Sequence, residues 1–144
     1  MGQYWYPVNL DKKEFVHPHQ LGAGLKLWEQ LANHPGTGAA LIVLCAAMPE
    51  ARGGGDLDPV GQTGNYAAVA TRTIGRWAGD RIALVGDYAE NEDLAPEHEA
   101  GGIYRRCGDG EYTDITSDVC TVIEHELDGR YTGEGWKHWE RAAH

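Results

Sequence analysis

The sequence predicts a single α+β domain, with a mixed or antiparallel sheet of about four to six strands and two main helices. Three observations predict this class. Short β-rich runs open the chain, apolar stripes at helical spacing occupy 20–33 and 116–128, and no linker or repeat divides the 144 residues. We expect residues 1–144 to form one domain, with a mobile acidic loop at 89–101 and a tryptophan-containing tail at 130–144.

The N-terminal segment predicts a β-hairpin followed by a helix. The runs QYWYPVNL (3–10) and KEFVHP (13–18) alternate aromatic or β-branched residues with polar ones, as half-buried strands do. Pro7 cannot donate a backbone hydrogen bond, so its strand is expected at a sheet edge or at a bulge. The helix at 20–33 carries apolar residues at helical spacing, namely Leu21, Leu25, Trp28 and Leu31.

The middle of the chain predicts two short buried strands. The run AALIVLCAAM (39–48) is apolar throughout, and its Ile-Val pair favours a strand, although its alanines leave a helix open. A second apolar run occupies 82–85. We expect Leu41–Leu44 and Ile82–Val85 to be neighbouring central strands. Between them, NYAAVATRTIGRW (65–77) is compatible with a short helix or an extended strand.

The C-terminal part predicts a second hairpin and the clearest helix of the chain. The segment IYRRCGDGEYTDI (103–115) contains Gly108-Asp109-Gly110, a turn signal between two short runs. The helix at 116–128 carries one apolar stripe of Ile115, Val119, Val122, Ile123 and Leu127.

Charge and cysteine content exclude several classes of protein. The formal net charge of −10 makes a nucleic-acid backbone an unfavourable partner, whereas it suits solubility or docking onto a basic protein groove. The start lacks the order of a signal peptide, and the apolar run at 39–48 is too short to cross a bilayer. Three cysteines without a CxxC pair argue against a disulfide framework. We expect a reduced, cytoplasmic protein with neither nucleic acid nor membrane as partner.

Several motifs recur in a fixed order: MGQYWYPVNLDKKEFVHPH at the start, GLKL at 24–27, RGGGD at 52–56, and WAGDRI leading into GDY at 77–88. Together they resemble a family of small bacterial, archaeal and bacteriophage proteins. Members of that family open with an MGQYY-like run and VNLDKKEY, and continue with GLKL, GRGGGD and W-x-GDRI before GDY. The resemblance covers 1–28 and 52–88, about half of the chain. It implies a shared fold and a shared site and names no reaction. The segment after Tyr88 and the tail depart from the family pattern.

The glycine-rich loop is the first candidate for ligand binding. Three consecutive glycines can expose backbone N–H groups that form a nest for an anion, and a neighbouring arginine adds positive charge. The alternative is a tight surface turn whose aspartate bonds its own backbone. The candidate ligand-binding residues of this loop are Arg52, Gly53, Gly54, Gly55 and Asp56.

Polar residues also flank the short strand at 82–85. At its entrance, Asp80 and Arg81 are expected to be structural, closing a turn and pairing with a neighbouring strand. Arg76 is a candidate for binding negative charge, and it could also bridge to Asp80 across the intervening turn. At the exit, Asp87 and Tyr88 follow a glycine, where ligands often bind in sheets that carry helices. We expect these two to be functional, facing Arg52 and Asp56.

These residues predict a domain that binds a small polar or anionic ligand, such as a nucleotide. The alternative is a non-enzymatic acidic interaction protein, a phage-type antagonist that binds a host protein through 89–101 and the tail. A homodimer is compatible with either. The triplet His17-Pro18-His19 has a spacing that metal sites use, yet it more often marks a bend, so no metal site is predicted. The sequence contains no recognised nucleophile or zinc-protease motif and names no cofactor, and catalysis remains open.

Overall fold

The computed structural model describes residues 3–32, 36–47, 57, 64–95, 97 and 99–127. In this part of the chain, four strands form one mixed sheet in the order β3-β1-β2-β4, and this confirms the predicted α+β class. The central pairs β1·β3 and β1·β2 are antiparallel, whereas β2 and β4 are parallel. The strands are β1 (Trp5–Asn9), β2 (Glu14–Phe15), β3 (Ile82–Gly86) and β4 (Thr113–Asp114).

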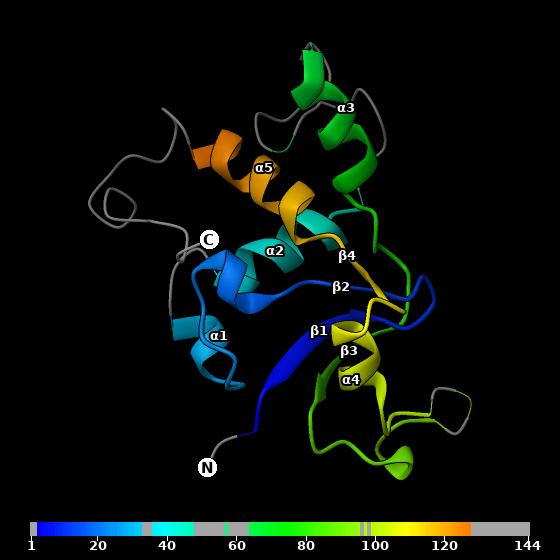
Figure 1. The fold of residues 1–144 in the computed structure, drawn as a ribbon. Coiled ribbons are helices and arrows are strands. Elements are labelled where there is room, and N and C mark those ends of the chain that lie inside the picture. The colour runs from blue at the N-terminus through cyan, green and yellow to red at the C-terminus, as the bar shows by residue number, and fades with distance from the viewer. Residues whose placement is uncertain are drawn as a thin grey trace.

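Three helices of ten residues or more accompany the sheet, where the sequence predicts two. They are α2 (Gly36–Cys45), α3 (Gly64–Thr73) and α5 (Thr116–Leu127). These three lie together above the sheet in Figure 1, whereas α4 lies below it beside β1 and β3. The shorter elements are η1 (Pro18–Leu21), α1 (Glu29–Ala32), η2 (Asn91–Asp93) and α4 (Ile103–Gly108).

The molecule has two clusters of buried apolar residues. The larger one fills the space between α2, α3 and α5, and it also takes in Val16, Leu21 and the fully buried Trp77. The smaller one lies between one face of the sheet and α4. It consists of Tyr6, Val8, Phe15, Val85, Ile103, Cys107 and Tyr112.

The predicted N-terminal hairpin is confirmed, but the position expected for Pro7 is wrong. β1 pairs antiparallel with β2 through Val8↔Phe15, and it lies inside the sheet rather than at its edge. Leu10 N–H donates to the Arg81 carbonyl, so the even-numbered residues of β1 bond to β3. The nitrogen of Pro7 therefore faces β2, beyond the last residue pair of that short ladder. The Pro7 carbonyl still accepts a hydrogen bond from the Val16 N–H at 3.2 Å, so proline costs only the return bond, at the point where the ladder ends.

The predicted helix at 20–33 is largely wrong, because only α1 is α-helical in that range. Gly22 ends η1 with φ +80°, a conformation that favours glycine. A Cβ at Gly24 would lie 2.2 Å from Oε1 of Glu29, so the chain passes close to that side chain. The apolar stripe consequently turns outward in its second half, and Trp28 is 78% exposed.

The predicted strand at Leu41–Leu44 is also wrong, because this segment belongs to α2. Its buried residues Thr37, Ala40 and Leu44 are three and four positions apart, which is helical spacing, whereas Ile42 points outward and is 66% exposed. The flanking alanines, which have the highest helix propensity, outweigh the Ile-Val pair. β3 therefore has β1 as its neighbour, and β3 is an edge strand rather than a central one.

The predicted hairpin at 103–115 is wrong in its first half. Residues 103–108 form α4, because Ile103 and Cys107, four positions apart, both pack on the sheet. Gly102 begins this helix with φ +94°. The second half forms β4, which pairs with β2.

Three further expectations concern the C-terminal helix, residues 65–77 and the cysteines. The C-terminal helix is confirmed as α5, which buries Val119, Val122 and Ile123, and the open choice at 65–77 resolves as the helix α3. Cys45, Cys107 and Cys120 form no disulfide bond within the described residues. Within the residues that the structure describes, no helix is long and apolar enough to cross a membrane.

Candidate functional site

The glycine-rich loop cannot be placed relative to the sheet. Arg52, Gly53, Gly54, Gly55 and Asp56 lie outside the described residues, as does the tail at 130–144. Their predicted role in binding an anion stays a prediction.

Arg76 takes part in an ion pair that supports the core. Its Nε lies 2.9 Å from each carboxylate oxygen of Glu14, a residue that is buried in β2. Trp77 Nε1 also donates to Oε1 of Glu14, at 3.0 Å. The expected bridge from Arg76 to Asp80 is therefore replaced by a pair with Glu14. The guanidinium of Arg76 is already bonded to Glu14. Binding of a ligand by Arg76 stays a prediction.

The polar groups at the entrance of β3 hold the turn between β1 and β2. Asp80 accepts hydrogen bonds from Asn9 Nδ2, at 2.8 Å, and from Lys12 Nζ. Arg81 places its Nε and one terminal nitrogen 3.0 and 2.8 Å from Oδ1 of Asp11, and its backbone N–H donates to Oδ2 of the same residue. These contacts fit the structural role expected for this end of the strand.

The exit of β3 is more open. Asp87 accepts a hydrogen bond from the backbone N–H of Tyr4 at 3.1 Å, and its own N–H donates to the Tyr4 carbonyl. Tyr88 is 60% exposed and lines a hollow of about 330 Å³, which we name the strand-exit hollow. The walls of this hollow include Trp5, Leu84, Gly86, Tyr88, Asp93 and Leu94.

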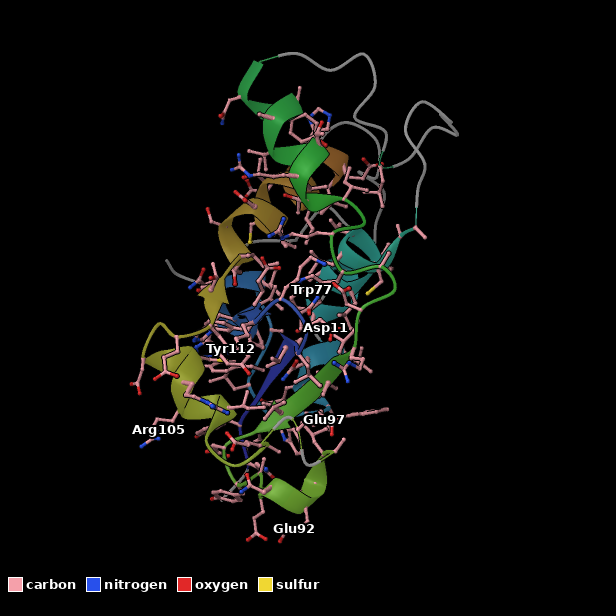
Figure 2. All side chains as sticks on the ribbon, turned by 90° about the vertical axis from the view of Figure 1, so that its right-hand side faces the viewer. Asp11, Trp77, Glu92, Glu97, Arg105 and Tyr112 are labelled. Carbon is pink, nitrogen blue, oxygen red and sulfur yellow. The ribbon has the colours of Figure 1, made fainter. Side chains whose placement is uncertain are left out.

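A larger hollow, of about 630 Å³, lies between the sheet and the end of α4, and we name it the histidine hollow. Tyr112, labelled in Figure 2, marks its position beside α4. Its walls carry an imidazole, a thiol, a carboxylate and three aromatic rings. They are formed by Tyr6, Phe15, His17, Cys107, Gly108, Gly110, Tyr112, Thr113 and Asp114.

His17 is held firmly in this wall, yet one of its ring nitrogens has no partner. Its backbone N–H donates to Oγ1 of Thr116 at 2.7 Å, and its ring lies 5.1 Å from the ring of Tyr6. Nδ1 is buried and makes no hydrogen bond to any residue that the structure describes. Burial lowers the pKa of His17, although the nearby Asp114 opposes this shift, so the imidazole is neutral at pH 7.

The other polar groups of the histidine hollow differ in what they can do. Oδ1 of Asp114 accepts one hydrogen bond from the backbone N–H of Thr116, at 2.9 Å, and another from the Thr116 hydroxyl. Thr116 is the first residue of α5. Oδ2 makes no hydrogen bond within the described residues. Burial raises the pKa of the Cys107 thiol to about 12, so this cysteine stays protonated and is a poor nucleophile. The described residues contain no group of three side chains that could hold a metal ion.

The sequence flagged His17 but missed the residues that join it. Cys107, Tyr112 and Asp114 fall in the segment predicted as a hairpin, and that prediction did not place the hairpin beside His17. The helix α4 followed by the parallel pairing of β4 with β2 brings them next to His17. The segments IYRRC and YTD do not indicate this arrangement, because the parallel pairing of β4 with β2 is a contact between distant parts of the chain.

Comparison with protein-family models, curated proteins and solved structures finds no match for this chain. The resemblance of its motifs to a family therefore stays a prediction.

Proposed function

We propose that this protein binds a small polar ligand, neutral or cationic, in the histidine hollow. The buried, unpartnered Nδ1 of His17 is the observation that carries the proposal. A buried polar atom without a partner costs about 1–3 kcal/mol, and a ligand that bonds to it offsets this cost.

The rest of the hollow supports the same class of ligand. Oδ2 of Asp114 can accept a hydrogen bond from an amino or ammonium group. Tyr6, Phe15 and Tyr112 are largely buried, and the parts of their rings that line the hollow can contact a planar or apolar group. A ligand that bears N–H donors on a flat ring or an amine satisfies both features.

The charge of the walls argues against an anion at this place. None of the described residues that line the hollow is lysine or arginine. The guanidinium of Arg106 lies 5.9 Å from the centre of the Tyr112 ring. It donates a hydrogen bond to the Glu99 carbonyl at 3.1 Å. A phosphate in the hollow would face Asp114, so we do not expect the anion predicted from the sequence to bind in this hollow.

A titration with a small panel of compounds tests the proposal. Adenosine, cytidine and histamine are the probes, and adenosine monophosphate is the anionic counterpart of adenosine. At about 100 times its Kd, a bound probe raises the free energy of unfolding by about 2.7 kcal/mol. Amide chemical shifts should move at His17, Gly110 and Tyr112.

His17→Phe is the decisive variant, because it keeps a ring of similar size and removes both nitrogens. We expect it to weaken binding about tenfold, whereas His19→Phe, its exposed neighbour, leaves the Kd unchanged. Equal affinity in both variants, or no response to any probe, contradicts the proposal. Tighter binding of the monophosphate than of adenosine would favour the glycine-rich loop instead.

A further inference from the structure

One backbone edge of β3 has no partner strand among the described residues. Its partner β1 takes the hydrogen bonds of alternate residues, as the bonds from Leu10 to Arg81 and from Asp87 to Tyr4 show. In an antiparallel pair, the N–H and C=O groups of the intervening residues Ile82 and Leu84 then point away from β1. No described residue bonds to the backbone of these two on that side.

Apolar side chains line the same edge. Ile82 and Leu84 share one face of the sheet and are 37% and 44% exposed. Edge strands are commonly protected by charged side chains or proline, and β3 has neither between Ile82 and Gly86. The strand-exit hollow opens beside Leu84 and is closed off by Trp5, Tyr88 and Leu94. It is large enough for an apolar side chain from another chain.

Negative charge surrounds this edge. Figure 2 shows Glu97 beside β3 and Glu92 at the far end of the following segment. The pKa of Glu90 is raised, first because its protonated form can donate a hydrogen bond to Glu92 and then through charge repulsion from Glu92 and Asp93, which is the effect of crowded carboxylates. The cation nearest the strand, Arg81, is paired with Asp11 and Glu97. A second copy of this acidic chain would be repelled, so the surface suits a basic partner.

We propose that the edge of β3 binds an extended segment of a partner protein that carries Lys or Arg residues alternating with apolar ones. The segment adds as a strand beside β3, and its backbone bonds to the outward groups of Ile82 and Leu84. One apolar side chain enters the strand-exit hollow, and basic side chains face Glu92 and Asp93. This inference does not depend on ligand binding in the histidine hollow.

Synthetic peptides and their fluorescence anisotropy test this inference. The probe is a labelled seven-residue peptide of alternating lysine and valine, with acetyl and amide ends. Its controls are a glutamate-valine peptide and a lysine-valine peptide N-methylated at the alternate residues that would donate to β3. We expect binding of the first peptide only, with each control at least about tenfold weaker. Raising the salt concentration should weaken binding further.

Leu84→Pro is the matched variant of the protein. Proline removes the outward N–H and obstructs an added strand, yet an edge strand tolerates it where that N–H faces solvent. We expect at least about a tenfold loss of affinity, whereas Leu84→Thr, which keeps the N–H, loses less. Ile42→Thr, a change at another exposed apolar residue, on α2, serves as the control for general surface effects.

Three results would overturn the inference. The first is equal binding of the N-methylated peptide, which would show that no strand is added. The second is equal binding to the Leu84→Pro protein, provided that its circular dichroism spectrum matches the parent. The third is a dimer in sedimentation that Leu84→Pro dissolves, because the edge would then be occupied by a second copy.

Discussion

The two ends of β3 differ in how their polar side chains are held. At the entrance, Asp80 and Arg81 are each bound to side chains of the turn that joins β1 and β2. At the exit, Asp87 accepts a backbone N–H from Tyr4, and Tyr88 is largely exposed beside a hollow. Charged residues of similar kind thus serve different purposes at two ends of one strand.

The geometry of the sheet explains this difference. At the entrance, the turn at 10–13 between β1 and β2 lies against the start of β3. Charged side chains of this turn can therefore pair with those that precede β3. At the exit, the chain leaves the sheet after Gly86, and no second hairpin turn within the described residues pairs its charges with this end. Stability is therefore concentrated at the entrance, and the exit is free to contact other molecules.

Arg76→Met, just before the entrance, should have the largest effect on stability. It leaves the carboxylate of Glu14 buried with only Trp77 as a remaining side-chain donor. Removing one partner of a buried ion pair is costly, and we expect a loss of about 3 kcal/mol in the free energy of unfolding. Urea denaturation followed by tryptophan fluorescence measures it.

Arg72→Met is the matched control for that variant. Arg72 makes the same kind of two-bond pair with Asp118, but on the exposed surfaces of α3 and α5. Exposed pairs contribute little, so this change should hardly alter stability. Equal losses in the two variants would show that the burial of Glu14 is not what matters.

The entrance and the exit can be compared directly through Asp80→Ala and Asp87→Ala. The first change should destabilise the fold more than the second, because Asp80 links Asn9 and Lys12 to the start of β3. Hydrogen bonds from Lys12 and then Asn9 hold the pKa of Asp80 below its ordinary value.

The lowered pKa of Asp80 gives this comparison a pH signature. The contribution of Asp80 to the stability of the fold is fully present above the pKa that its carboxyl has in the unfolded state, about 4. It is lost as the pH falls through the lower pKa of the folded state. Denaturation at neutral and acidic pH should therefore show a smaller acid-dependent loss in Asp80→Ala than in the parent. A larger loss in stability from Asp87→Ala would reverse the roles of the two ends.

Much of this contrast could be predicted from the sequence. The turn sequence WAGD before an apolar run implies that Asp80 and Arg81 must find nearby partners, and Gly86 before Asp87 implies an exit from the strand. These are local inferences, since each depends on residues close together in the chain. The hairpin of β1 and β2 and the helix α5 are local in the same sense, and both are confirmed.

The remaining parts depend on contacts between distant segments. Residues 39–48 are apolar throughout, so their pattern cannot show which face is buried, and packing against α5 decides for a helix. The histidine hollow requires β4 to pair with β2 across about 100 residues of chain. No pattern within IYRRCGDGEYTDI indicates that pairing, and its residues were therefore missed.

The smallest effect is expected from Leu84→Ala, and it separates stability from binding at β3. Full burial of a leucine side chain contributes about 1.5–3 kcal/mol, and Leu84 is 44% exposed, so its truncation should cost less than about 1 kcal/mol. Ile42→Ala on α2 should cost equally little. Both losses of stability are smaller than those expected if Ile42 and Leu84 lay in central strands.

Val85→Ala is the matched control, because Val85 packs between the sheet and α4. Its truncation should lower the free energy of unfolding by about 2 kcal/mol. If Leu84→Ala destabilised the fold as much as Val85→Ala, the outer face of β3 would be part of the core. It would then be unavailable to a partner.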